Sequence, residues 1–299
     1  MFSQSKICVL PLLLLLVAPC SSTTIVLILT PRFIVAGADR RTNDIDSIGK
    51  FANQGTTTKV ILLGGRQIIA CIGMNKWTPQ DRSATYDFQV WIKQVSAKIA
   101  PNTPISVLAD IVEREATRTF TKTVPIERMM RDGTLPHAKA IDKFLTQFIV
   151  AGFENGSPVL VEINFPLDWK NNLLLPAVRG TGISPNSGSY DFLYVDGQTD
   201  EIGPIQLHNT NSYCYKRMKV LAPGSLEKIH ANKMTDRTEA VRTVRALITV
   251  EAEKAPQVVG SGSTIVVLPT RGVGDETNYD VPLTVRSQQE RKQEKKLKK

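Results

Sequence analysis

The chain has few of the residue types from which disulfide frameworks and metal sites are built. Its 299 residues include four cysteines and three histidines. Cys8 and Cys20 fall in an apolar N-terminal stretch, so only Cys71 and Cys214 are left for a folded domain, and two cysteines do not make a disulfide framework. The histidines lack the spacing of metal ligands. The sequence therefore predicts no cofactor, and it leaves a bridge between Cys71 and Cys214 open.

Several familiar catalytic patterns are also missing. The order of residues does not match a Ser-His-Asp hydrolase, and no glycine-rich phosphate loop follows a predicted strand. After the first 22 residues, no segment is apolar enough to span a bilayer. These absences argue against a metalloenzyme, a nucleotide-binding enzyme and a polytopic membrane protein.

The N-terminus has the layout of a secretory signal peptide. Lys6 precedes an apolar run over residues 7–18, and the small residues Cys20, Ser21 and Ser22 follow. The sequence predicts a signal peptide over residues 1–22, export to the cell exterior or the periplasm, and membrane contact only through this leader before cleavage. An N-terminal strand or a retained anchor is the alternative interpretation.

The positive charge is concentrated at the C-terminus. Of the net charge of +9, residues 286–299 carry +5 and Lys6 carries +1, so the body from residue 23 to 285 carries only +3. The end of the chain has no apolar periodicity, which predicts a disordered basic tail over 286–299. Because no aromatic residues alternate with these charges, the sequence predicts no specific nucleic-acid partner.

The first half of the body reads as two hairpins followed by two helices. Strands are expected at 23–30 and 33–39, around a Pro-Arg turn, and again at 59–63 and 66–73, around two glycines. Apolar residues then recur at helical spacing over about 88–99 and 104–118.

The second half repeats strands before a helix. We expect strands at 144–153 and 158–165, a loop-rich region over about 166–190, a strand near 190–197, a helix capped by Asp236 with Glu239 that runs to about 253, and a last strand at 263–269. This order predicts helices that cover two stacked sheets, that is, an α+β fold with α/β/β/α layers.

The segment TTIVLILTPRFIVAGADRR, which begins at Thr23, is similar to the start of a mature proteasome β-type subunit. These subunits belong to the N-terminal nucleophile (Ntn) hydrolase superfamily, where a Thr-Thr pair opens the first strand and Asp-x-Arg closes the second. Asp39 lies sixteen residues after Thr23, as in that family, and Arg41 matches the arginine. Lys59 matches the lysine that opens the third strand, after an apparent insertion, and Gly73 matches the oxyanion glycine. The resemblance covers residues 23 to about 270.

The resemblance implies an N-terminal threonine hydrolase, and the chemistry explains the residue types. A free terminal threonine supplies both a hydroxyl nucleophile and an α-amine whose pKa, about 7.7 to 8, suits a base at neutral pH. A lysine ammonium would lower the pKa of the hydroxyl, and a buried aspartate would hold that lysine. The backbone N–H at Gly73 would stabilise the oxyanion. By the same resemblance Cys71 lines the substrate pocket, whereas a small buried apolar role is the alternative.

The sequence departs from the family where the amine should find its supporting groups. Pro223 stands at the expected serine of a Gly-Ser segment, with Ser225 nearby. Pro256 and Val259 stand at the aspartate and serine expected after the last long helix, where Ser261 or Ser263 are the substitutes.

The sequence thus predicts an exported threonine peptidase or amidohydrolase that acts on peptide or other amide substrates. A noncatalytic proteasome-like binding or assembly protein is the alternative, and assembly into a homo-oligomer is left open. A protein that binds polyanions through its basic tail is a more distant third interpretation.

Overall fold

The computed structural model describes nine stretches of the chain. They are residues 23–45, 51–77, 86–135, 143–180, 192–197, 209–231, 233–256, 259–260 and 262–282. The predicted leader and the predicted basic tail lie outside them. Within these stretches, no helix is long and apolar enough to cross a bilayer.

A five-stranded antiparallel sheet contains the N-terminal segment of the body. Its strand order is β13-β1-β2-β14-β15, so the two strands of the first hairpin lie at its centre and next to a strand from the end of the chain. The strands are β1 (Thr24–Leu29), β2 (Phe33–Asp39), β13 (Phe192–Gly197), β14 (Ser263–Pro269) and β15 (Asp275–Tyr279).

The second large sheet is also antiparallel in its main path, with the order β11-β10-β9-β6-β5, and β12 pairs with β10. Its strands are β5 (Val60–Leu63), β6 (Gln67–Gly73), β9 (Phe144–Glu154), β10 (Ser157–Asp168), β11 (Leu173–Leu174) and β12 (Val178–Arg179). Two tight turns close its long hairpins. Gly64 and Gly65, in the connection between the paired residues Leu63 and Gln67, have φ of 54° and 70°. Asn155 and Gly156 form the two-residue turn between β9 and β10 with φ of 52° and 79°, as such turns between twisted strands require.

Two small ribbons complete the strands. They are β3 (Arg41–Ile45) with β4 (Phe51–Thr56), and β7 (Lys76–Trp77) with β8 (Tyr86–Asp87).

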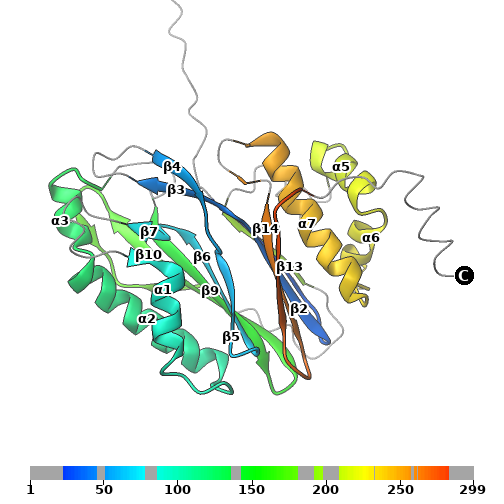
Figure 1. Ribbon diagram of the computed structural model, residues 1–299, viewed down its shortest axis with the longest axis horizontal. Helices are drawn as coiled ribbons and strands as arrows, with labels where there is room; N and C mark the ends of the chain where they lie inside the picture. The colour runs from blue at the N-terminus through cyan, green and yellow to red at the C-terminus, as the bar shows by residue number, and fades with distance from the viewer. Residues whose placement is uncertain are drawn as a thin grey trace, which may run out of the picture.

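The helices form two groups along the chain. The first group is α1 (Phe88–Ser96), α2 (Ile105–Arg118), the π-helix η1 (Thr119–Thr123) and α3 (Ile126–Arg131), and the second is α5 (Tyr213–Leu221), α6 (Ser225–His230) and α7 (Arg237–Lys254). Asp236 caps α7 as predicted, because its carboxylate accepts from the N–H groups of Thr238 and Glu239 at 2.7 and 3.2 Å. Figure 1 shows the two groups on opposite flanks of the molecule, with the strands between them.

Three apolar clusters account for this arrangement. One joins β6, β9 and β10 to α1 and α2, and another joins β1, β2 and β14 to the second helix group. The third contains side chains from both large sheets and lies between them. In β1 the alternation is complete: Ile25, Leu27 and Leu29 belong to the cluster between the sheets, whereas Val26 and Ile28 face α7. The fold is therefore mixed α+β with two antiparallel sheets and helices packed on them.

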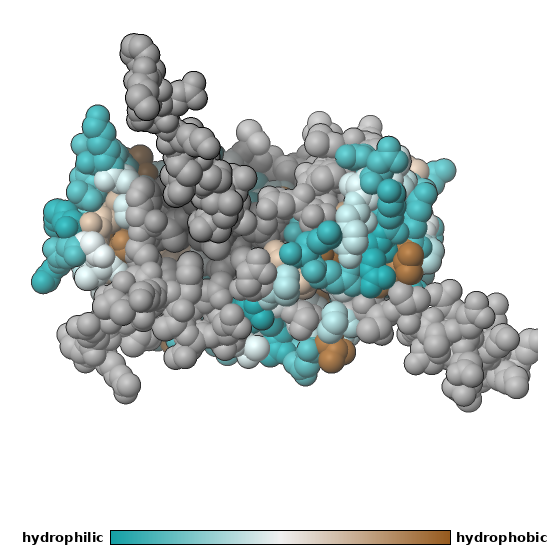
Figure 2. Space-filling view, turned by 90° about the horizontal axis from the view of Figure 1, so that it is seen from above, coloured by the Kyte–Doolittle hydropathy of each residue, from teal (hydrophilic) through white to brown (hydrophobic). Residues whose placement is uncertain are grey.

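The described residues on the face seen from above are mostly hydrophilic. Seen from above, the coloured residues are mainly teal, and the apolar ones stand as separate spots (Figure 2). Large exposed apolar side chains, such as Val90, Val220 and Val273, come from different elements, and such scattered residues need no partner to explain them.

The sequence predicted the buried elements well and the polar ones poorly. The predicted strand at 263–269 is confirmed as β14. It is not the last strand, however, because β15 follows it. β15 is an edge strand with the sequence DETNY, exposed along almost its whole length, so it lacks the apolar alternation of a strand. The region 166–190 is also less irregular than expected, since β10 extends to Asp168 and two short strands pair with it.

Candidate active site

The carboxylate of Asp39 lies at the end of β2 and is held by backbone groups from three parts of the chain. Its oxygens accept from the N–H groups of Thr24 at 2.8 Å, Arg41 at 3.1 Å and Gly260 at 3.2 Å. The approach of Gly260 needs a glycine, because a Cβ there would lie 2.9 Å from the backbone nitrogen of Arg41. The carboxylate thus joins the start of β1, the end of β2 and the segment before β14.

Lys59 completes the hydrogen bonding of Asp39. Its ammonium lies 3.2 and 3.1 Å from the two carboxylate oxygens, and both side chains are fully buried. Lys59 directly precedes β5, so this ion pair connects the two large sheets. Burial lowers the pKa of Lys59 from its ordinary value, and the charge of Asp39 opposes this effect. The Lys59 ammonium is thus a compact donor group held by Asp39 next to the start of β1.

Thr23 lies beside this pair and is itself fully buried. Its Oγ1 has no hydrogen-bond partner among the residues that the structure describes. By the alternation of β1, Thr23 shares the face of Ile25 between the sheets, whereas Thr24 shares the face of Val26 toward α7. In the full chain the Thr23 nitrogen belongs to the peptide bond with Ser22. Cleavage of that bond would turn it into an amine.

Gly73 ends β6 in a conformation that only glycine adopts without strain. Its φ is +85°, and a Cβ would lie 2.7 Å from the carbonyl oxygen of Leu145. This geometry alone explains the glycine as a turn residue. It is also compatible with a backbone N–H left accessible to a ligand, and the oxyanion role of Gly73 stays a prediction.

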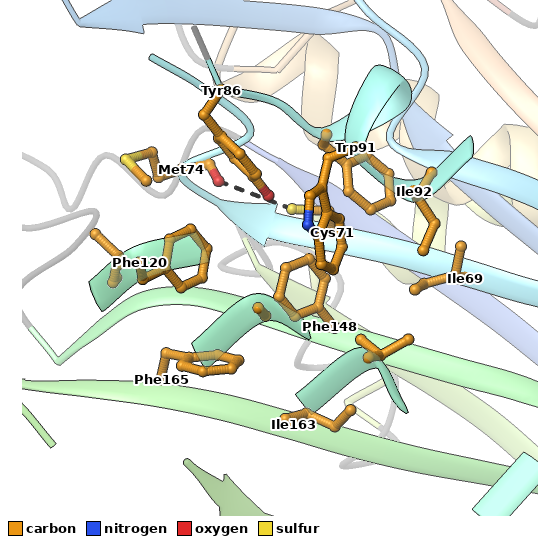
Figure 3. Close-up of a cluster of buried hydrophobic side chains, with 14 of the residues drawn as sticks. Ile69, Cys71, Met74, Tyr86, Trp91, Ile92, Phe120, Phe148, Ile163 and Phe165 are labelled. Carbon is orange, nitrogen blue, oxygen red and sulfur yellow. Dashed lines mark hydrogen bonds between the residues drawn. The ribbon is translucent and has the colours of Figure 1, made fainter. Parts of the chain in front are cut away.

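Cys71 lies in the apolar core that β6 and β9 share with α1. Figure 3 shows its sulfur between Tyr86 and Trp91, above Phe148. The thiol is fully buried, and burial raises its pKa to about 12. The backbone N–H of Cys71 donates to the carbonyl of Lys59 at 2.9 Å, so the residue is next to the ion pair. Its predicted role in a substrate pocket would require the surrounding aromatic side chains to move.

The question of a disulfide between Cys71 and Cys214 is resolved. Both cysteines are free and buried. They belong to different clusters, Cys71 to the one under α1 and α2, and Cys214 to the one under α7.

The residues considered as support for the threonine amine fall in different places. Ser263 pairs directly with Asp39 across β14 and β2, and its side chain is buried. Ser225 is the first residue of α6, whose apolar side chains belong to the cluster under α7. Val259 is buried next to Gly260, and Ser261 lies outside the described residues. Ser263 is thus the only one of these serines that the described residues place opposite Asp39.

Sequence reasoning placed the segment after α7 at the site through Pro256, Val259 and Ser263, but it missed the contacts that hold this segment there. The guanidinium of Arg41 donates to the carbonyl of Pro256, which ties this segment to the end of β2. The backbone N–H of Gly260 then reaches Asp39. The run GSGS at 260–263 was a usable signal, since glycine is favoured where two backbones approach closely.

A pocket of about 530 Å³ lies elsewhere. Its lining includes Arg66, Thr103, Glu154 and Pro269, and Pro269 is at the end of β14 opposite to Ser263. We place the candidate site at the Asp39 end, where a buried ion pair and a buried hydroxyl come together. Across the described residues, no group of three or more His, Cys, Asp and Glu side chains is placed to hold a metal ion.

Comparison with known proteins gives no further assignment. No family profile matches the chain, and no curated protein matches it significantly.

Proposed function

We propose that this chain is an exported N-terminal threonine amidohydrolase that cleaves peptide bonds through an acyl-enzyme on Thr23. The observation that carries the proposal is the fully buried pair of Asp39 and Lys59, whose carboxylate accepts from the N–H of Thr24. The neighbouring hydroxyl of Thr23 has no hydrogen-bond partner among the described residues. A buried ion pair is costly to desolvate, and perturbed ionisable groups gather at functional sites.

We also propose that the fold is a four-layer α/β/β/α sandwich of the Ntn hydrolase type. The three apolar clusters support it, since two lie between a sheet and helices and the third lies between the sheets. The proposed domain runs from 23 to 285, after the signal peptide 1–22 and before the basic tail 286–299.

In the proposed mechanism, removal of residues 1–22 frees the α-amine of Thr23. The amine accepts the proton of Oγ1, which attacks the carbonyl carbon of the substrate. The N–H of Gly73 stabilises the oxyanion, and the ammonium of Lys59 stabilises the negative charge that develops on Oγ1. The protonated amine returns its proton to the leaving nitrogen, which leaves an ester on Oγ1. Water then attacks the ester carbonyl as the same amine accepts its proton. The bond between the acyl carbon and Oγ1 breaks, the amine returns the proton to Oγ1, and the acid product leaves.

The second candidate function is a noncatalytic proteasome-like binding or assembly protein. Pro256 and Val259, at the positions where the resemblance implies an aspartate and a serine, have side chains that can neither donate nor accept a hydrogen bond. A weakened proton relay would favour this candidate.

One experiment separates the two. The exported protein is analysed by mass spectrometry for its first residue and is then treated with a peptide electrophile that reacts with a hydroxyl and a neighbouring α-amine. The enzyme should begin at Thr23 and be labelled there. Thr23→Ala should not be labelled, and Thr23→Ser should be labelled more slowly. A correctly processed protein that starts at Thr23, is folded and is never labelled would support the noncatalytic candidate.

A further inference from the structure

A second polar cluster lies between the two large sheets, close to Thr23. We call it the acceptor cluster, and its residues are Gln147 of β9, Glu162 and Asn164 of β10, and Tyr194 and Asp196 of β13. The side chains are linked across the sheets: the phenol of Tyr194 donates to Asp196 Oδ2 at 2.7 Å, and Gln147 Nε2 donates to the same oxygen at 2.6 Å.

Register places this cluster beside the candidate site. Asp196 lies directly opposite Ile25 in the pairing of β13 with β1, so both side chains face the space between the sheets. Thr23, two residues before Ile25, shares this face. On the other sheet, Gln147 follows Thr146, the residue that pairs with Gly73. The cluster therefore adjoins both Thr23 and the proposed oxyanion glycine.

The cluster contains more acceptors than donors. Tyr194 has one proton, yet both Asp196 and Glu162 lie within reach of its hydroxyl. Burial, followed by these two carboxylates, raises the pKa of the Tyr194 phenol, so it remains a neutral donor with a single O–H. When that proton goes to Asp196, Glu162 needs a donor from elsewhere. None of the described residues forms an ion pair with Glu162.

Asn164 adds an independent observation. It pairs directly with Gln147, and it lies two residues from Glu162 on the face of β10 that points between the sheets. The residue is only 9% exposed, and its Oδ1 has no hydrogen-bond partner in the part of the chain that the structure describes. A buried acceptor without a donor is destabilising, because it has lost its hydrogen bonds to water without replacement. This oxygen points to a ligand that brings N–H groups.

The geometry points to a substrate subsite: we infer that the acceptor cluster binds the cationic side chain of an arginine or lysine residue near the scissile bond of the peptide. A guanidinium carries five N–H donors and no acceptor, and an ammonium carries three donors. Either group would bring a positive charge to Glu162 and a donor to Asn164 Oδ1. This inference rests on the proposed peptidase function, because it names the substrate class of the same site.

The test uses binding, so that it does not depend on catalysis. The probes are a capped tetrapeptide with one arginine and the same peptide with citrulline, which has nearly the same shape and no charge. Their affinities for the Thr23→Ala chain, beginning at residue 23, are measured by calorimetry. We expect the arginine peptide to bind at least about tenfold more tightly, because charge-assisted hydrogen bonds are roughly twice as strong as neutral ones. Equal binding of the two peptides would overturn the inference.

Two substitutions locate the effect. Glu162→Gln keeps the shape and removes the charge, and Asn164→Leu removes the unpartnered acceptor; each should reduce the arginine preference severalfold. Glu276→Gln on β15 is the matched control, since it removes one charge far from the cluster, and it should leave the preference unchanged. If both cluster variants are folded and keep the full preference, the cluster is only a polar tie between the sheets. If either variant fails to fold, the arginine and citrulline comparison still decides.

The two proposals fail in different ways. Arginine-selective binding to Thr23→Ala, together with no hydrolysis by a correctly processed wild-type protein, would keep the subsite and remove the peptidase. Hydrolysis of both peptides at equal rates, with equal binding, would keep the peptidase and remove the subsite.

Discussion

The Asp39–Lys59 ion pair and the acceptor cluster differ in how their charges are satisfied. Asp39 receives three backbone N–H groups and the ammonium of Lys59, and the pair is fully buried. Glu162 is half-buried and shares one phenol proton with Asp196. It lies near Asn164 Oδ1, which has no donor among the residues that the structure describes. The ion pair has its hydrogen bonds satisfied without a ligand, whereas the acceptor cluster has more hydrogen-bond acceptors than donors.

This difference separates two uses of buried charge. A complete cluster has its geometry fixed before a substrate arrives, as a catalytic site requires. An incomplete one lowers its free energy when a complementary ligand binds, as a recognition site requires. Substitutions in each of the two clusters test this difference.

The largest expected effect is on stability, from removal of the charge of Asp39. Asp39→Asn leaves the ammonium of Lys59 buried without a counter-charge, which should cost about 3 to 5 kcal/mol of unfolding free energy. Glu162→Gln, an equivalent change in the acceptor cluster, should cost under about 1 kcal/mol, because Glu162 is half exposed and gives up a surplus charge. Chemical denaturation of both variants measures the difference.

The pH dependence of the unfolding free energy of Asp39→Asn provides a control for this prediction. Burial lowers the pKa of Lys59 below its unfolded value of 10.5, so the unfolded state holds more protons between the folded pKa and 10.5. The unfolding free energy of the variant should therefore rise as pH rises through this window. Equal losses of stability in the Asp39 and Glu162 variants would contradict the comparison.

The next largest effect on stability is expected from substitution of Gly73. In Gly73→Ala the new Cβ would lie 2.7 Å from the carbonyl of Leu145 at a positive φ, so backbone strain and overlap act together. We expect a loss of about 2 to 4 kcal/mol. Gly133→Ala is the matched control: its φ is +68°, and a Cβ there meets nothing within 4 Å. It should lose only about 1 kcal/mol. Similar losses in thermal denaturation would show that Gly73 is an ordinary turn glycine.

The complete cluster was accessible from sequence, and the incomplete one was not. Asp39 and Lys59, with their neighbours Thr23 and Gly73, could be named because their spacing resembles that of the N-terminal nucleophile hydrolases and because each stands at the start or end of an apolar strand. Local order along the chain is enough to bring such residues together. The contact of Asp39 with Gly260 was not predicted, because the GSGS run indicates a close approach of two backbones without naming the partner, which lies 221 positions away in the sequence.

The acceptor cluster combines three strands, and its residues give no local signal. Asn164 and Glu162 occupy polar positions in an alternating strand, which usually indicates the solvent side. In this fold that side faces the other sheet. Similarly, β15 and the ribbon of β3 and β4 were missed because polar edge strands are stabilised by their pairing and not by apolar alternation. In both cases the pairing and packing of the folded chain, and not the local sequence pattern, determined the structure.

A smaller effect is expected from the thiol next to the ion pair. The pKa of Cys71 is raised from its ordinary value of 9.0 to about 12, mainly by burial. The folded protein therefore keeps the thiol proton between pH 9 and 12, while the unfolded chain releases it. Relative to Cys71→Ala, wild-type stability should fall by about 1.4 kcal/mol per pH unit above pH 9. Denaturation at pH 8, 10 and 11 measures this difference, and a pH-independent difference would mean that the thiol is exposed to solvent.

The smallest expected effect is that of Thr24, which has the chemistry of Thr23 but faces the other side of β1. Thr24→Val keeps the β-branched shape and the backbone N–H that donates to Asp39, so it should lose under about 1 kcal/mol of stability. It should also keep its peptidase activity, because the proposed nucleophile and amine both belong to Thr23. Activity is compared on proteins confirmed to begin at residue 23. An inactive but folded Thr24→Val would mean that the alternation of β1 has been assigned to the wrong faces, and that the hydroxyl pointing between the sheets is that of Thr24.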